Sequence, residues 1–161
     1  MAHRLLIRDG DQVRAASADE VLDRAAVLLA QRFRRGTAVL ENPERTRQYL
    51  RHQIATLSYE VFGLLLLDSR HRLIRSDILF RGTIAGASVH PREVARVVLE
   101  SNAADVILFH NHPSGVAAPS QADELITRRL REALSLLDVR VLDHLIIAGP
   151  QEYSFAETGL L

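Results

Sequence analysis

With 161 residues, 47% of them hydrophobic and 25% charged, the chain has the composition of one globular domain with room for a substantial core. The absence of cysteine excludes disulfide bonds and zinc sites built on thiolates, including those of the zinc nucleobase deaminases, which need a cysteine pair. Equal numbers of acidic and basic residues leave a net charge of zero, so no overall field attracts nucleic acid.

The sequence contains no segment long enough to cross a membrane. Its longest apolar run, Val61 to Leu67, is far shorter than the roughly 20 residues that a spanning helix requires. The start, Met1-Ala2-His3-Arg4, lacks the apolar core of a signal peptide. We therefore expect a cytoplasmic protein that makes no membrane contact.

The N-terminal part of the chain predicts a short hairpin or frayed tail, followed by one helix. Asp9-Gly10-Asp11 is a turn signal, and Ser17-Ala18-Asp19-Glu20 is a capping box that begins a helix reaching about Phe33. The apolar stripe of this helix consists of Val21, Leu22, Ala25, Leu28 and Leu29. We expect the tail and helix, residues 1–40, to pack on a domain formed by residues 41–161.

The middle of the chain predicts a helix and then a hairpin of strands. Asn42-Pro43 begins a helix to about Leu57, because proline is favoured in the first turn of a helix. The uninterrupted apolar run Val61–Leu67 indicates a buried central strand. Leu73–Phe80 follows after a turn as its hairpin partner, and Arg81–Ser88 predicts a third, shorter strand.

The C-terminal part of the chain alternates helices and strands. The expected elements are a helix over 91–102, a strand over 105–110, a helix over 120–138, and strands over 139–148 and 151–155. The second of these helices should bury Leu130, Ala133, Leu134 and Leu137. The whole order of elements predicts an α/β fold, in which helices flank a mixed central β-sheet.

A metal-binding pattern lies between the strand expected over 105–110 and the helix expected over 120–138. His110 and His112 stand one residue apart, so their side chains share one face of a strand, with Cα atoms about 7 Å apart, and can converge on one ion. Asp123 falls in the first turn of the helix, where the helix dipole favours its ionised form. Two histidines and an aspartate leave one position of a tetrahedral zinc open for water, whose pKa the metal lowers to about 7, as in catalytic sites.

Ser120 and Asp123 also have a purely structural interpretation. Ser-x-x-Asp at the start of a helix is close to a capping box, in which the serine caps a backbone amide and the acid reaches back. From the residues alone, both interpretations stay open. Asn111 should face the side of the strand opposite the two histidines. Further on, Asp143-His144 is either a pair that orients a metal ligand or a hydrogen bond within its own strand.

The string His110-x-His112, seven residues, Ser120-x-x-Asp123 resembles the metal signature of the JAMM (MPN+) metalloproteases. The fuller string His110-Asn111-His112-Pro113-Ser114-Gly115 resembles the bacterial RadC family within that group. Further matching pieces are Glu60-Val61-Phe62, Arg81-Gly82-Thr83, Pro91-Arg92-Glu93-Val94, Leu142-Asp143-His144-Leu145-Ile146-Ile147 and Gly159-Leu160-Leu161. The resemblance implies a JAB/MPN (cytidine-deaminase-like) domain over residues 41–161, preceded by an N-terminal helix as in the short form of the family.

The resemblance also implies a chemistry. It suggests a zinc-dependent metallopeptidase or isopeptidase, a hydrolase of peptide or protein substrates, with zinc held by His110, His112 and Asp123. Glu60, just before the central strand, matches the glutamate that acts as general base. Ser120 matches the residue that hydrogen-bonds the oxyanion, although the helix cap needs the same hydroxyl. Without the resemblance, Glu60 also has the simpler interpretation of a solvated acid at a strand edge.

Two other functions are open at this point. The traditional label of the RadC family implies a role in DNA repair or recombination, and three groups of arginines are available for phosphate contacts: Arg32, Arg34 and Arg35; Arg45, Arg47 and Arg51; Arg128, Arg129 and Arg131. Because the net charge is zero, we expect solvated helix faces and at most weak nucleic-acid binding. A metal-free interaction scaffold is the other alternative, and the intact ligand set argues against it. The sequence does not decide between a monomer and a homodimer.

Overall fold

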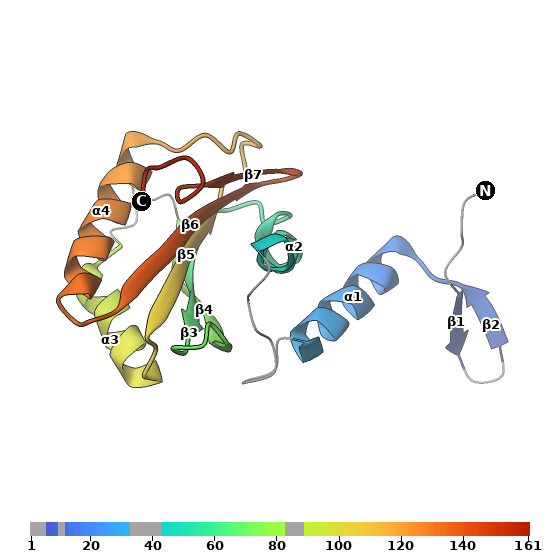
Figure 1. The fold of residues 1–161 in the computed structure, drawn as a ribbon. Coiled ribbons are helices and arrows are strands. Elements are labelled where there is room, and N and C mark those ends of the chain that lie inside the picture. Colours follow the sequence, from blue (N-terminus) through green and yellow to red (C-terminus); the bar gives the residue numbers. More distant parts are fainter. Residues whose placement is uncertain (1–5, 10–11, 33–42, 83–88) are drawn as a thin grey trace.

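The computed structural model describes residues 6–9, 12–32, 43–82 and 89–161 (Figure 1). The elements in chain order are β1 (Leu6–Asp9), β2 (Gln12–Ala15), α1 (Ala18–Arg32), α2 (Pro43–Ile54), β3 (Val61–Leu67), β4 (Leu73–Arg81), α3 (Pro91–Ser101), β5 (Asp105–Asn111), α4 (Gln121–Ser135), β6 (Arg140–Ala148) and β7 (Gln151–Ser154). None of the helices in these ranges has the length and apolar character of a membrane span. The strand predicted over Arg81–Ser88 falls mostly outside the described residues, and its first residue ends β4.

Five of the strands form one mixed sheet, in the order β4-β3-β5-β6-β7. β5 and β6 run parallel, whereas the other neighbouring strands are antiparallel. Every residue of β3 and of β5 is buried, because helices cover both faces of the sheet. The predicted α/β fold, with helices on both sides of a mixed sheet, is confirmed.

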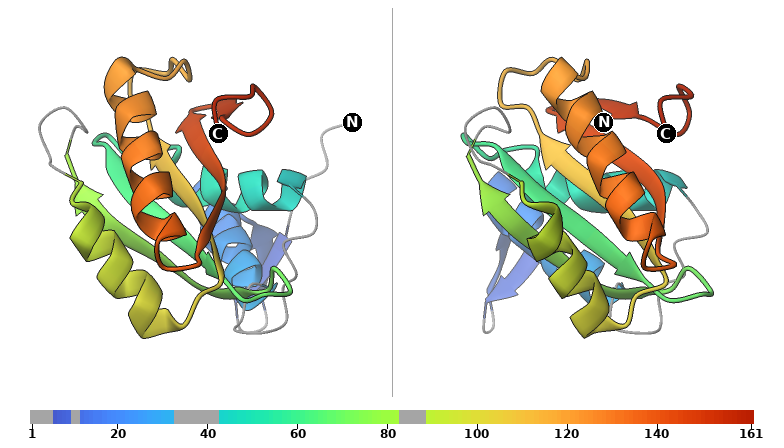
Figure 2. Two further views of the ribbon diagram at one scale, coloured as in Figure 1. Left: turned by 60° about the vertical axis from the view of Figure 1, so that its left-hand side comes forward. Right: turned by 90° about the vertical axis from the view of Figure 1, so that its left-hand side faces the viewer.

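The two faces of the sheet carry two separate hydrophobic cores (Figures 1 and 2). α3 and α4 lie over one face, and the core on that side includes Phe62, Leu64 and Leu66. α2 lies over the other face, where the core includes Leu65 and Leu67. Because successive residues of a strand point to opposite faces, the single apolar run of β3 supplies both cores.

The end of α4 differs from the expectation. The helix ends at Ser135, because Asp138 adopts the left-handed conformation (φ 56°) and the carbonyl of Leu134 accepts a hydrogen bond from the N–H of Val139. Leu134 is fully buried as predicted, but Leu137 lies beyond the helix and is 37% exposed. The predicted burial of Leu137 is therefore wrong.

The N-terminal hairpin and helix extend beyond α2, on the side away from α3 and α4 (Figure 1). β1 and β2 form the expected short hairpin. α1 starts at the predicted capping box, in which Glu20 accepts a hydrogen bond from the N–H of Ser17 at 2.9 Å. Two leucines of its apolar stripe are about half exposed, Leu22 at 51% and Leu28 at 46%. The division of the chain at residue 40 stays a prediction.

Candidate metal centre

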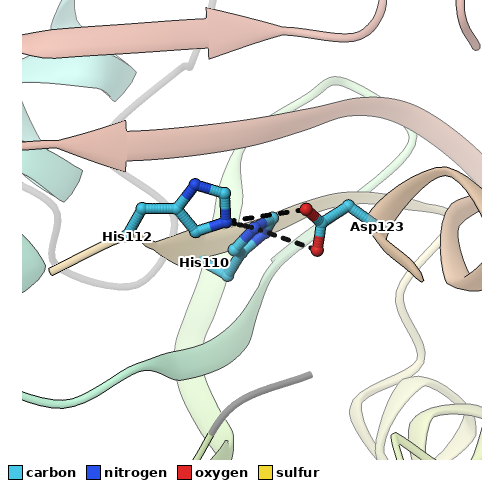
Figure 3. A group of neighbouring side chains, drawn as sticks. All are labelled: His110, His112 and Asp123. Carbon is cyan, nitrogen blue, oxygen red and sulfur yellow. Dashed lines mark hydrogen bonds and ion pairs between the residues drawn. The ribbon is translucent and has the colours of Figure 1, made fainter. Parts of the chain in front are cut away.

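Three potential metal ligands meet between the end of β5 and the start of α4 (Figure 3). His110 Nε2 lies 3.0 Å from His112 Nε2 and 3.3 Å from Asp123 Oδ1. His112 Nε2 lies 3.5 Å from Asp123 Oδ2. One ligand atom from each residue thus lies within 4.8 Å of the other two. The structure brings together the three residues predicted as ligands, in a largely buried group that could hold a metal ion.

The segment after β5 fixes the orientation of His112. Its N–H donates to the carbonyl of Ile147 at 2.9 Å, which keeps the residue in line with β5 beside β6. The chain then turns at Gly115, whose φ of 80° is costly for other residues. His112 Nδ1 lies 2.8 Å from the carbonyl oxygen of Val116. A carbonyl oxygen only accepts, so Nδ1 carries a proton, and in the neutral ring Nε2 is the nitrogen whose lone pair can bind an ion.

Asp123 belongs to a helix cap and to the ligand group at the same time. Its Oδ2 accepts hydrogen bonds from the N–H and from the hydroxyl of Ser120, both at 2.7 Å. Ser120 Oγ in turn accepts from the N–H of Asp123 at 3.2 Å, which completes a capping box. The capping interpretation is correct, but it does not exclude metal binding, because Oδ1 is directed at His110.

Burial and the contacts within the group shift the pKa of each of its three members. Burial lowers the pKa of the fully enclosed His110, against the opposing influence of Asp123. Burial also disfavours ionisation of Asp123, yet the adjacent imidazoles of His110 and His112 and the hydrogen bond from the Ser120 hydroxyl hold the pKa of this carboxyl far below its usual range. A hydrogen bond with Asp123 raises the pKa of His112. An ionised carboxylate and a neutral His110 are the forms that metal binding requires.

Glu60, the predicted general base, lies at the edge of this group. β3 and β5 pair Phe62 with His110, so the residue two places before Phe62 lies level with His112. The Glu60 side chain is half-buried. After larger contributions that include burial and Asp123, the charge of Glu60 also acts to raise the pKa of both histidines.

Asn111 holds the backbone on both sides of Glu60. Its Oδ1 accepts a hydrogen bond from Val61 N at 2.8 Å, and its Nδ2 donates to the carbonyl of Tyr59 at 3.0 Å. Alternation along β5 places Asn111 on the face of Ile107 and Phe109, opposite that of His110, as expected. These partners could not be predicted from the sequence, because they lie about fifty positions away and no local pattern connects them to Asn111.

The two residues of the Asp143-His144 pair have different partners, so each of the two interpretations applies to one of them. His144 Nε2 lies 2.8 Å from His110 Nδ1, the ring nitrogen that does not face the ligand group. Asp143 instead accepts hydrogen bonds from the N–H of His144, the hydroxyl of Ser154 and the N–H of Ala156. The histidine thus contacts a potential ligand, whereas the aspartate fixes the chain around the end of β7.

Fold and site together define a mixed α/β domain with a candidate metal centre at the end of a central strand. The profile of one protein family, described as RadC-like JAB domain, matches residues 40–160. The chain belongs to this family, which confirms the resemblance drawn from the motifs.

Several similar proteins carry the name UPF0758 protein. The chain is 58% identical to one from Nitrosococcus oceani, over 76% of this chain and 55% of the relative. It is 54% identical to one from Vibrio cholerae, over 89% of this chain and 90% of the relative. A third, from Thioalkalivibrio sulfidiphilus, is 54% identical over 91% and 65%. The chain thus spans about half the length of the first relative and most of the second, and their names state no activity.

Proposed function

We propose that the domain is a zinc-dependent metallopeptidase or isopeptidase, which hydrolyses an amide bond in a peptide or protein. The observation that carries the proposal is the convergence of His110, His112 and Asp123, with Glu60 at the edge of the same group. Two imidazole nitrogens and a carboxylate oxygen form a donor set that suits zinc. Membership in a JAB family supports the same chemistry.

The three side chains fit the requirements of a catalytic zinc site. His110 Nε2, His112 Nε2 and a carboxylate oxygen of Asp123 would hold the ion, and three protein ligands leave one tetrahedral position for water or substrate. When bound, zinc supplies a Lewis acid that lowers the pKa of water to about 7 and polarises the scissile carbonyl.

Proton transfer falls to Glu60 in this proposal. Its carboxylate takes a proton from the attacking water and gives it to the nitrogen of the leaving amine. The hydroxyl of Ser120 turns from Asp123 toward the oxygen that becomes negative as the carbonyl carbon becomes tetrahedral. The N–H of Ser120 keeps its own hydrogen bond to Asp123 Oδ2, so the helix cap survives this rotation.

The variant Glu60→Gln tests the proposal. An amide keeps the shape of the side chain but cannot accept the proton, so hydrolysis should fall by about 10²–10⁴-fold with zinc content unchanged. The measurement pairs mass spectrometry of a defined peptide mixture, incubated with the zinc-loaded full chain, with elemental analysis of the same preparation.

Glu93→Gln is a matched control, because it neutralises another half-buried acid that lies in α3 and pairs with Arg96. Hydrolysis should be unchanged in this variant. Near-full activity of Glu60→Gln would contradict the role as base. Loss of zinc from Glu60→Gln would instead make Glu60 a ligand and reduce Asp123 to a helix cap.

A further inference from the structure

A buried chain of hydrogen bonds leads from α4 to the ring of His110. The hydroxyl of Thr127 donates to the backbone carbonyl of Asp123 at 2.6 Å. The same oxygen lies 2.6 Å from His144 Nδ1, and His144 Nε2 lies 2.8 Å from His110 Nδ1. Thr127, His144 and His110 are each at most 2% exposed, so water does not compete for these contacts.

His144 is neutral in this environment. Its ring stacks on Phe155 at a centroid distance of 4.8 Å and meets the edge of Phe62 at 5.8 Å. Its ring nitrogens face another imidazole and a hydroxyl, neither of which carries a negative charge. A positive charge enclosed by these groups would be costly, so the ring holds a single N–H.

The direction of the Thr127 proton then determines both tautomers. A hydroxyl has one proton, and that of Thr127 goes to the carbonyl of Asp123, so its oxygen accepts from His144 Nδ1–H. His144 Nε2 is therefore unprotonated and accepts from His110 Nδ1–H. The remaining nitrogen of His110, Nε2, bears a lone pair and faces His112 and Asp123.

The opposite tautomer of His110 would also make a favourable hydrogen bond. With the proton on Nε2, the ring would donate to Asp123 Oδ1, which lies 3.3 Å away. That arrangement satisfies the metal-free group but directs a hydrogen at the position of the ion. The chain through His144 and Thr127 opposes it, because it requires the proton of His110 on Nδ1.

We propose that His144 and Thr127 are positioning residues, which fix the tautomer and ring orientation of His110 so that the Nε2 lone pair faces the ligand group before an ion arrives. The consequence for zinc affinity rests on the proposed function, whereas the tautomer does not. Residues that hydrogen-bond a metal ligand in this way typically change metal affinity by about 10–100-fold when replaced.

Nitrogen NMR of the metal-free full chain, labelled with ¹⁵N-histidine, tests the tautomer directly. Wild-type His110 and His144 should both show the Nδ1–H form. Thr127→Val has nearly the same shape but no hydroxyl, so the proton of His144 should move to Nε2 and that of His110 to Nε2 as well. Thr127→Ser retains the hydroxyl and should keep the wild-type tautomers.

Zinc affinity of the same proteins, measured by competition with a chromophoric chelator, should fall by about 10–100-fold in Thr127→Val and stay unchanged in Thr127→Ser. A wild-type His110 that carries its proton on Nε2 would overturn the inference, and this reading needs no variant to fold. Unchanged tautomers in a folded Thr127→Val would overturn it too. Predicted tautomers without zinc binding would support the inference and contradict the proposed function.

Discussion

Asp123 uses its two carboxylate oxygens for different tasks. Oδ2 accepts hydrogen bonds from the N–H and the hydroxyl of Ser120, the first of which belongs to the capping box, while Oδ1 is directed at His110. The cap restricts the carboxylate to one orientation, and this reduces the entropy that ion binding would otherwise cost. Capping and metal binding were alternatives when only the sequence was considered, but at this residue they are compatible.

His112 is the proposed ligand whose protonation should govern metal binding near neutral pH. Its pKa is raised above the ordinary value of about 6.5 by the hydrogen bond with Asp123, whereas the pKa values of His110 and Asp123 are lowered. Zinc needs the unprotonated Nε2 of His112. The affinity of the site for zinc should therefore be constant at pH values well above the raised pKa of His112 and fall by about tenfold per pH unit below that pKa.

Chelator competition at a series of pH values measures this dependence. Because the pKa of His112 is raised, the decline should begin above about pH 6.5 as the solution is acidified. An affinity that stayed constant down to about pH 5 would show that His112 is not a ligand.

At the scale of elements, short sequence patterns predicted helices and strands well, whereas contacts between distant residues could not be predicted. The apolar run Val61–Leu67 and the capping boxes at Ser17 and Ser120 are short patterns, and each element they predicted is present. Other contacts join residues far apart in sequence. Asn111 hydrogen-bonds the backbone on both sides of Glu60, and His144 contacts His110. Such contacts depend on strand order and register, which periodicity alone does not determine.

Gly63 leaves no room for a side chain in the middle of β3. A β-carbon there would lie 2.5 Å from the backbone carbonyl of Asp77 and even closer to the ring of Phe109, in the middle of a fully buried strand. Gly63→Ala should therefore lower the free energy of unfolding by about 3 kcal/mol, because the carbonyl belongs to a paired strand and cannot easily move. Urea denaturation followed by circular dichroism measures the change.

Gly159→Ala is the comparison variant, because it replaces a glycine by alanine without a steric clash and adds only the strain of a left-handed backbone. Gly159 has a φ of 76° but open space around it, so alanine should cost about 1 kcal/mol there. A Gly63→Ala protein as stable as the wild type would show that β3 and β4 are not packed in the register described.

At the scale of the whole molecule, periodicity predicted that α1 is a helix but not what covers its apolar side. Leu22, Val27 and Leu28 are each about half exposed. Hydrophobic spacing reveals a face that prefers burial, and the partner for that face follows only from tertiary structure. The N-terminal region is accordingly the part of the chain for which the sequence was least informative.

The charge distribution of the molecule bears on DNA binding. Arg47 and Arg51 form ion pairs with Glu152, so they are partly neutralised. The exposed arginines on α4 are Arg128, Arg129 and Arg131, whereas residues 34 and 35 lie outside the described part of the chain. With a net charge of zero, we expect weak binding to duplex DNA that declines steeply as salt increases.

Fluorescence anisotropy with a labelled duplex, at about 50 and about 200 mM salt, measures this binding. The double variant Arg128→Gln, Arg129→Gln should reduce whatever affinity remains at the lower salt concentration. Tight, sequence-selective binding at the higher concentration would contradict the expectation and favour a role in DNA repair over peptide hydrolysis.

The proposed zinc site is tested most directly by the metal content of the full chain and of Asp123→Asn, after zinc loading and dialysis. The asparagine amide oxygen can still accept a hydrogen bond from Ser120, so the helix start should persist, but the amide is a poor zinc ligand. Asp138→Asn, at an exposed left-handed position, is the control and should keep its zinc. We expect one zinc per chain in the wild type and its loss in a folded Asp123→Asn. A wild type without zinc, or an Asp123→Asn variant that retains it fully, would contradict the proposed site.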